Sequence, residues 1–272
     1  MRASRCPRAT RSLSSNSSLR GELRIDEPAS GVVRLTISNP GKRGALDQTI
    51  LARFAALMPE LDARCVLITG EDRIFSAGYD ISELPESVFA DEAERLIAHP
   101  FAAAIDAIDA YPFPTVAALN GHAIGGGLEL ALACDLRVAA HGIKLGMPPA
   151  KLGLVYSHTG IRRFIHAIGA PRTRELFLVG GRIDAAAALG WGLVNAVHEG
   201  EALAGAALAL ATGIAGNAPL AQRGNKQVIR AVLDADLERE LLELRRACFS
   251  SEDFREGVRA FAHKRAPVWR GR

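Results

Sequence analysis

The 272-residue sequence lacks the features that mark several classes of protein. None of its apolar runs approaches the ~18–20 residues of a membrane helix, so no membrane span is expected. Its histidines and its four cysteines are not grouped at metal-ligand spacing, and no metal site is predicted. A serine-hydrolase elbow, Gly-x-Ser-x-Gly, is also missing, which argues against that class of enzyme.

Acidic residues are missing from the first 20 positions, which hold five of the 33 basic residues and none of the 30 acidic ones. The net charge of +3 therefore comes from this tail, and the rest of the chain is close to neutral. A neutral body gives no reason to expect nucleic-acid binding. The arginine- and serine-rich composition resembles an organellar transit peptide, but a disordered extension or a start assigned too early explains it as well.

Two of the cysteines, Cys65 and Cys134, lie in apolar segments. Buried thiols in a reducing compartment explain this better than disulfides do. We therefore expect a cytoplasmic protein, or a mitochondrial one if residues 1–20 are a transit peptide.

Strands alternate with helices in the first half of the chain, and helices dominate the second half. This order predicts an α/β core followed by a helical C-terminal region. The predicted strands are residues 22–26, 32–37, 64–69, 115–119 and 135–140, and the predicted helices are residues 45–62, 90–110, 126–133, 160–168, 172–179, 185–189, 201–215 and 220–233, with two more between 236 and 263.

Three consecutive glycines, Gly125 to Gly127, join a predicted strand to a predicted helix. Glycines leave room for backbone N–H groups to approach a ligand, and a helix N-terminus adds unpaired donors and partial positive charge. Such a turn suits a developing oxyanion. It does not match a dinucleotide fingerprint, because Leu130 stands where Gly or Ala is needed, and no Gly-Lys-Ser/Thr follows as in a phosphate loop.

Glu129 lies in the first turn of this helix, between Leu128 and Leu130. A carboxylate desolvated beside an active turn is a candidate acid or base. The alternative is an acid that complements the helix dipole.

A second segment, Ile74-Phe-Ser-Ala-Gly-Tyr-Asp-Ile81, follows a predicted strand. Together with the glycine turn, it resembles the crotonase, or enoyl-CoA hydratase/isomerase, superfamily, and the resemblance covers nearly all of the chain after residue 20. Further matching segments are Asn39-Pro-Gly-Lys-Arg-Gly-Ala-Leu-Asp47, Leu152-Gly-Leu154, Gly181-Arg-Ile-Asp-Ala185, Gly190-Trp-Gly-Leu-Val-Asn195 and Ala260-Phe-Ala-His-Lys-Arg265.

The resemblance implies a crotonase-type spiral of ββα units over residues 21–200 and a helical trimerisation region over residues 201–272. It also implies a homo-oligomer, a trimer or a dimer of trimers. The substrate would be an acyl-CoA thioester, with coenzyme A entering as part of the substrate and no separate cofactor. The thioester oxygen would be held by the amides of Ala77 and Gly126, with Glu129 as a catalytic acid or base.

Pro149 stands where hydratases of this superfamily carry a second Glu. Hydration uses two positioned carboxylates, and losing one acid or base typically removes about 10²–10⁴ in rate. Three segments are instead similar to the methylmalonyl-CoA decarboxylase branch: residues 75–85, 147–161 and 245–257. That branch places a tyrosine in the active site, matched here by Tyr156, whose alternative role is a core tyrosine.

The resemblance also implies which other residues contact the substrate. Phe261 and Lys264 match C-terminal residues that contact coenzyme A, although a solvated basic tail explains Lys264 equally well. Tyr79 replaces a histidine of the decarboxylase motif. The remaining substrate-binding candidates are Lys42, Asp80, Ile81, Gly125, Pro149 and His158.

The sequence thus predicts an enzyme that stabilises a thioester enolate, most directly by decarboxylating a malonyl- or methylmalonyl-type CoA. Loss of CO2 beside a thioester generates an enolate without a general base. The alternatives are an enoyl-CoA hydratase or isomerase, with Glu129 alone or helped by Tyr156 or His158, and a non-catalytic acyl-CoA-binding protein.

Overall fold

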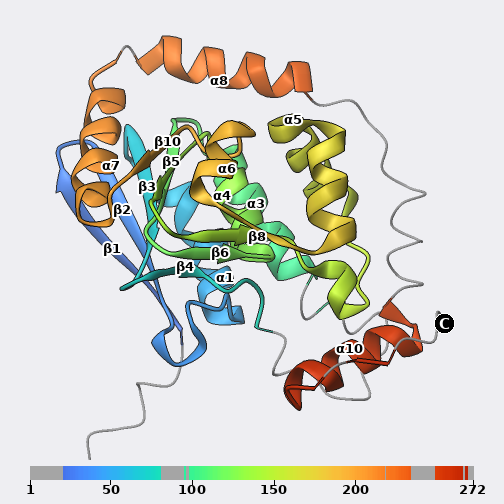
Figure 1. The fold of residues 1–272 in the computed structure, drawn as a ribbon. Coiled ribbons are helices and arrows are strands. Elements are labelled where there is room, and N and C mark those ends of the chain that lie inside the picture. Colours follow the sequence, from blue (N-terminus) through green and yellow to red (C-terminus); the bar gives the residue numbers. More distant parts are fainter. Residues whose placement is uncertain are drawn as a thin grey trace, which may run out of the picture.

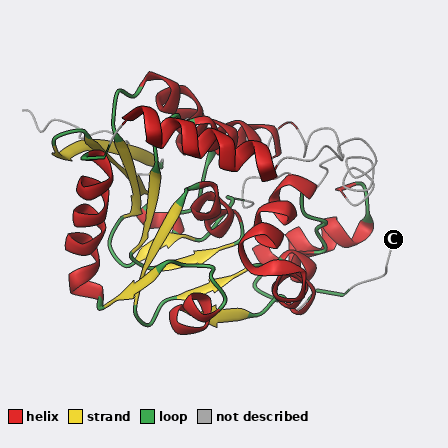
Figure 2. Ribbon diagram, turned by 90° about the horizontal axis from the view of Figure 1, so that it is seen from above, coloured by secondary structure: helices red, strands yellow, loops and turns green. Residues whose placement is uncertain are grey.

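The computed structural model describes residues 21–80, 95, 98–217, 219–233, 249–265 and 267–268. The predicted tail of residues 1–20, the N-terminal part of the predicted helix 90–110, all of residues 236–248, and Ile81 lie outside the described residues. Strands occupy the centre of the molecule and helices lie on either side of them (Figures 1 and 2).

The larger sheet has six strands in the order β1-β2-β3-β5-β7-β10. β1 pairs antiparallel with β2, and the other neighbours are parallel. All five residues of β5 are buried, as expected for a parallel strand covered on both faces. The strands are β1 (Glu22–Ala29), β2 (Val32–Ser38), β3 (Cys65–Gly70), β5 (Thr115–Leu119), β7 (Leu136–Ala140) and β10 (Ala196–His198).

A second sheet has the order β4-β6-β8-β9. Its strands alternate along the chain with those of the larger sheet, so β3 is followed by β4, β5 by β6 and β7 by β8. This alternation winds the chain as a spiral, as predicted. The four strands are β4 (Ile74–Ser76), β6 (His122–Ile124), β8 (Lys144–Gly146) and β9 (Arg182–Asp184).

Neither the second sheet nor β10 was predicted from the sequence. Each of these strands has three residues, too few to show the two-residue alternation by which a strand is recognised. They exist because neighbouring strands pair with them, for instance β6 with β4 and β8.

The helices cover the two sheets, and several helices begin at a capping side chain. Among the described residues, four side chains cap helices by accepting an amide from the first turn: Asp47, Ser157, Asp184 and Ser251. The α-helices are α1 (Gln48–Leu57), α3 (His99–Ala110), α4 (Gly126–Ala133), α5 (His158–Arg174), α6 (Ala185–Gly190), α7 (Gly200–Ala215), α8 (Pro219–Leu233) and α10 (Glu252–Ala262). Short helical turns are η2 (Pro40–Lys42), η3 (Met58–Glu60), η5 (Pro149–Leu152) and η6 (Glu175–Val179).

Two predicted helices have different limits for backbone reasons. The helix predicted over residues 45–62 ends as α1 at Leu57, because Pro59 allows only a 3-10 turn. α5 is interrupted at Gly169, which has φ 71° and ψ 163°, just before Pro171. This break corresponds to the predicted gap between residues 168 and 172.

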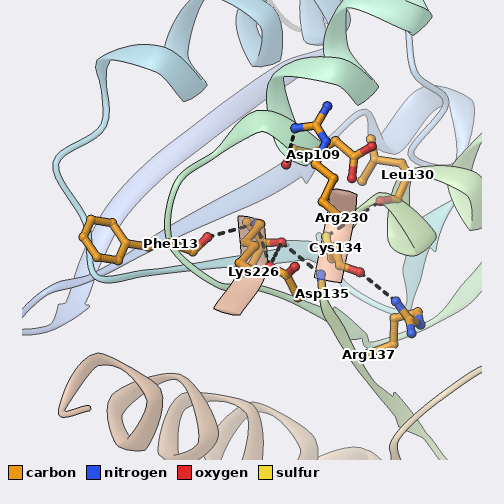
Figure 3. Close-up of polar contacts among 9 residues, drawn as sticks. Asp109, Phe113, Leu130, Cys134, Asp135, Arg137, Lys226 and Arg230 are labelled. Atoms are coloured by element: carbon orange, nitrogen blue, oxygen red, sulfur yellow. Dashed lines mark hydrogen bonds and ion pairs between the residues drawn. The ribbon is translucent and has the colours of Figure 1, made fainter. Parts of the chain in front are cut away.

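α8 is anchored on the core by its basic side chains (Figure 3). Lys226 Nζ donates to Asp135 Oδ2 at 2.7 Å and to the carbonyl of Phe113 at 3.1 Å. Arg230 Nη1 reaches the carbonyl of Asp109 at 3.4 Å. Asp135 also accepts the amide of Thr115, which ties the helix to the start of β5.

Cys65 and Cys134 are free, buried thiols, as the sequence predicted. The Cys134 thiol lies against the carbonyl of Leu130 at 3.7 Å (Figure 3). Burial, and secondarily the negative charge of Asp135, raises the pKa of both thiols to about 12.

We expect both thiols to resist alkylation by iodoacetamide in the native protein at pH 8. The thiolate is the reactive form, and so high a pKa leaves very little of it, while burial blocks access. Peptide mapping by mass spectrometry checks this, with the protein unfolded in guanidinium as the control in which both react. Alkylation of either cysteine in the folded protein at the rate of an open thiol would contradict the buried positions.

Candidate functional site

The glycine turn between β6 and α4 presents unpaired amides. Gly125 has φ 55° and ψ −125°, a conformation open essentially to glycine. α4 begins at the next residue, and the amides of Gly126 and Gly127 have no hydrogen-bond acceptor in the described part of the chain. Both residues are buried, so two donors at a helix N-terminus lie inside the fold, where negative charge is favoured.

A loop after β4 lies against this turn. Gly78 has φ +92°, and a Cβ there would lie 2.6 Å from the carbonyl oxygen of Ile124 and 3.0 Å from the amide nitrogen of Gly126. A Cβ on Gly126 would lie 3.2 Å from the rings of Tyr79 and Phe101. These two rings pack at a centroid distance of 4.7 Å. The start of α4 therefore packs against this loop and beside an aromatic pair.

The loop after β4 is fixed by the segment that precedes α1. Both segments come together because they pair as one isolated parallel bridge between Leu46 and Tyr79. The bonds that join them are Ser76 Oγ to the Gly44 carbonyl at 2.7 Å, the Ala77 amide to the Arg43 carbonyl at 3.1 Å, the Leu46 amide to the Gly78 carbonyl at 2.8 Å, and the Asp80 amide to the Leu46 carbonyl at 3.3 Å.

This pairing corrects the predicted role of Ala77. Its amide donates to the Arg43 carbonyl and so faces the neighbouring segment, away from an oxyanion. The amide of Gly78 is likewise bonded to Ser76 Oγ at 3.1 Å. Along a paired strand, alternate residues direct their amides to opposite sides, so the Tyr79 amide points away from the segment of Leu46. Tyr79 replaces Ala77 as the candidate partner of Gly126.

Glu129 and Tyr156 form one polar pair. The carboxylate of Glu129 is buried, with the residue 2% exposed, as the flanking leucines predicted. The Tyr156 hydroxyl donates a short hydrogen bond to Glu129 Oε2. On the other oxygen, Oε1, the guanidinium of Arg163 lies at 3.8 Å. The structure thus joins two of the predicted residues and adds a cation between α4 and α5.

Sequence reasoning missed two residues that shape this pair, Arg163 and Gly160. A Cβ on Gly160 would lie 2.7 Å from Tyr156 Cε1 and 2.8 Å from Glu129 Oε1, so only glycine leaves room for both groups. The spacing could have pointed to both residues. Gly160 lies three residues after the capping Ser157, and Arg163 lies about one turn further along the same face of the helix.

Pro149 and His158 lie on either side of Tyr156 in the sequence. Pro149 is buried at the start of η5, so this position offers no carboxylate. His158 opens α5, and its Nε2 atom is buried with no hydrogen-bond partner among the described residues. An unpartnered imidazole nitrogen beside Tyr156 in sequence is available to a ligand or a water.

The predicted contacts to coenzyme A lie at the edges of the fold. Lys42 Nζ and Asp80 Oδ2 form an ion pair at 2.6 Å, which joins the two paired loops. Phe261 is 55% exposed on α10, and Lys264 follows that helix with φ 50°. α10 packs on η5, since a Cβ on Gly257 would lie 2.1 Å from the Leu152 carbonyl.

Among the residues that the structure describes, no three His, Cys, Asp or Glu side chains are grouped so as to hold a metal ion. Within the same residues, no helix combines the length and the hydropathy needed to cross a membrane.

Comparisons with known proteins agree with this architecture. Residues 27–272 match the family model described as enoyl-CoA hydratase/isomerase. A probable enoyl-CoA hydratase of Bacillus subtilis is 37% identical over 248 residues, which cover 88% of this chain and 95% of that protein. The 2,3-dehydroadipyl-CoA hydratase of Escherichia coli is 35% identical over 258 residues, with 89% and 96% covered. A solved structure of methylmalonyl-CoA decarboxylase with 2-nitronate-propionyl-CoA superposes with a TM-score of 0.84 at 27% identity, covering 92% of this chain and 98% of the other.

Proposed function

The chain belongs to the enoyl-CoA hydratase/isomerase family, of the crotonase superfamily, and we propose that it decarboxylates a malonyl- or methylmalonyl-type CoA thioester. The observation that carries the proposal is the Glu129–Tyr156 pair, which lies beside the glycine turn while Pro149 occupies the place of a second acid. The amides of Gly126 and Tyr79 provide the hole for the thioester oxygen.

The reaction needs charge stabilisation more than base catalysis. When the bond from the α-carbon to the carboxylate breaks, CO2 leaves and the electron pair passes into the thioester as an enolate. Two amides directed at the oxygen then hold the new negative charge, and each such donor is typically worth about 10²–10³ in rate. A proton afterwards adds to the α-carbon, so neither an oxidant nor a reductant is required.

The Glu129–Tyr156 pair handles the proton in this proposal. The one proton shared between the phenol and Glu129 is delivered by the phenol to the enolate carbon, and a proton from solvent then restores the pair. Because Arg163 lies 3.8 Å from the same carboxylate, the local negative charge that a substrate carboxylate meets is offset. The similarity to methylmalonyl-CoA decarboxylase supports this proposal.

Hydration or isomerisation of an enoyl-CoA is the second candidate. It is favoured by the names of the relatives from Bacillus subtilis and Escherichia coli. In that case Glu129 activates water or moves a proton, helped by Tyr156 or by the unpartnered nitrogen of His158. A third candidate is a protein that binds acyl-CoA without turnover.

Mass spectrometry tests the three candidate functions. The purified full chain is incubated separately with methylmalonyl-CoA, malonyl-CoA and crotonyl-CoA. We expect loss of CO2 from one of the first two and no change in crotonyl-CoA. Addition of water to crotonyl-CoA with both carboxylated thioesters intact would establish the hydratase instead. Tight binding of all three without a mass change would leave only the binding role.

We also propose that the chain assembles as a trimer or a dimer of trimers, as the family resemblance implies. Exposed apolar side chains on α8 and η6 support an assembly, since a monomer leaves them in water: Leu178, Val179, Val228 and Ile229. Sedimentation at the mass of one 28.9 kDa chain would overturn this.

A further inference from the structure

Arg163 is shared between an interior carboxylate and a more exposed one. Its Nη2 atom donates to Asp109 Oδ2 on α3 at 2.6 Å, whereas its Nη1 atom lies 3.8 Å from Glu129 Oε1. Asp106, on the same helix, lies at 4.0 Å and is largely exposed. The Arg163 side chain as a whole is 17% exposed. One partly buried cation therefore links α3, α4 and α5.

The two distances show which carboxylate holds the guanidinium. A separation of 2.6 Å is a charge-assisted hydrogen bond, but 3.8 Å is an ion pair without a hydrogen bond. Asp109 thus restrains Arg163 from closing on Glu129. Glu129 Oε1 gains the field of a positive charge without having its lone pairs occupied by it.

We propose that Arg163 is a positioning residue that sets the charge of the Glu129–Tyr156 pair, and that Asp109 limits how strongly it does so. This inference rests on the proposed function, because it assigns that pair to the chemistry. Arg163 favours the ionised form of this buried carboxylate, which is the form that accepts the Tyr156 hydrogen bond. Asp109 keeps the same carboxylate reactive, since a direct guanidinium bond would hold it as an inert ion pair.

Other charged or titratable side chains lie on the elements around α3, α4 and α5. His122 on β6 is exposed and accepts the amide of Lys144 at 3.0 Å. Arg137 on β7 donates to the carbonyls of Leu193 and Cys134. Arg230 of α8 reaches α3 at the carbonyl of Asp109 (Figure 3). His158, with its buried Nε2 atom, opens the helix that carries Arg163.

Substitutions of Arg163 and Asp109 should shift the protonation of Glu129 in opposite directions. An opposite charge within about 4–6 Å typically moves a carboxyl pKa by one to three units. Removing the cation in Arg163→Met should therefore raise the pH at which Glu129 takes up its proton, by about one unit or more. Removing the competing anion in Asp109→Asn releases Arg163 towards Glu129 and should lower it. Arg163→Lys keeps the charge and should stay near the wild-type value.

Carbon-13 NMR of the full chain labelled with δ-¹³C-glutamate measures this protonation directly, with Glu129→Gln identifying the signal. Arg172→Met is the matched control, because Arg172 lies on the same helix but pairs at the surface with Glu175 at 2.7 Å. Shifts of opposite sign in the Met and Asn variants, with the control unmoved, support the proposal. If the pH at which Glu129 is protonated does not change in either variant, or shifts in the same direction in both, the proposal is overturned. If Arg163→Met does not fold, the shift in Asp109→Asn alone decides.

Turnover measured on the same proteins separates this inference from the proposed function. If the titrations shift as expected while the wild type converts none of the three acyl-CoA thioesters, the charge-setting role stands and the proposed function fails. If the wild type is active and the titrations do not move, the proposed function stands and Arg163 has only a structural role.

Discussion

Gly78→Ala is expected to lower kcat/KM by about 10²–10³-fold, the usual effect of losing one oxyanion donor. The new methyl group would lie 2.6 Å from the Ile124 carbonyl oxygen and 3.0 Å from the Gly126 nitrogen, so the loop must move away from α4. That movement separates the Tyr79 amide from the Gly126 amide. Steady-state kinetics on the thioester that the wild type converts measures the loss.

Gly142→Ala is the matched control for backbone strain. Gly142 has φ +78°, similar to the +92° of Gly78, but a Cβ at Gly142 would have no neighbouring atom within 4 Å. Both variants incur the strain of a left-handed alanine, about 1 kcal/mol of stability. Only Gly78→Ala should lose activity. Equal activity in the two variants would contradict the placement of the oxyanion hole between the two loops.

Tyr156→Phe is expected to reduce kcat by about 10²–10⁴-fold with a small effect on KM, the range typical of removing an acid or base. The phenol is the hydrogen-bond donor on Glu129 Oε2, and without it a carboxylate that is 2% exposed loses a partner. Stability should fall by about 1–3 kcal/mol for that reason. Kinetics and thermal melting of the same preparation measure both effects.

The control is Tyr111→Phe, since Tyr111 is buried and its hydroxyl also makes hydrogen bonds. It donates to the Ala63 carbonyl at 2.6 Å and accepts the Ala63 amide at 3.0 Å, away from the glycine turn. Its loss should cost similar stability and leave kcat unchanged. A Tyr156→Phe protein as active as Tyr111→Phe would remove Tyr156 from the chemistry.

Predictions from local sequence were confirmed where the cause was local. The apolar run at residues 115–119 is the buried strand β5, and the turn at Gly125 is where α4 starts. The burial of Glu129 followed from its leucine neighbours. Family motifs supplied the spiral topology, which composition and periodicity did not indicate.

The prediction for Ala77 was wrong because a backbone amide takes its direction from its pairing partner. The motif located the loop, but the direction depends on Arg43, which lies 34 residues earlier and pairs with it in space. The three-residue strands of the second sheet were missed for a related reason, since their hydrogen bonds come from neighbours distant in the chain.

The sequence by itself determined the fold class, the glycine turn, the buried acid and the missing second acid at Pro149. The α/β class, the glycine turn and the buried acid follow from residue type and short-range order, which fix propensity, burial and turn geometry, whereas the spiral and the significance of Pro149 come from the family resemblance. Only the tertiary structure decided that Tyr79 faces the turn, that Tyr156 bonds Glu129, and that Arg163 lies between Glu129 and Asp109. Those relations join helices and loops far apart in the chain, and the distances that set their electrostatics exist only after the elements pack.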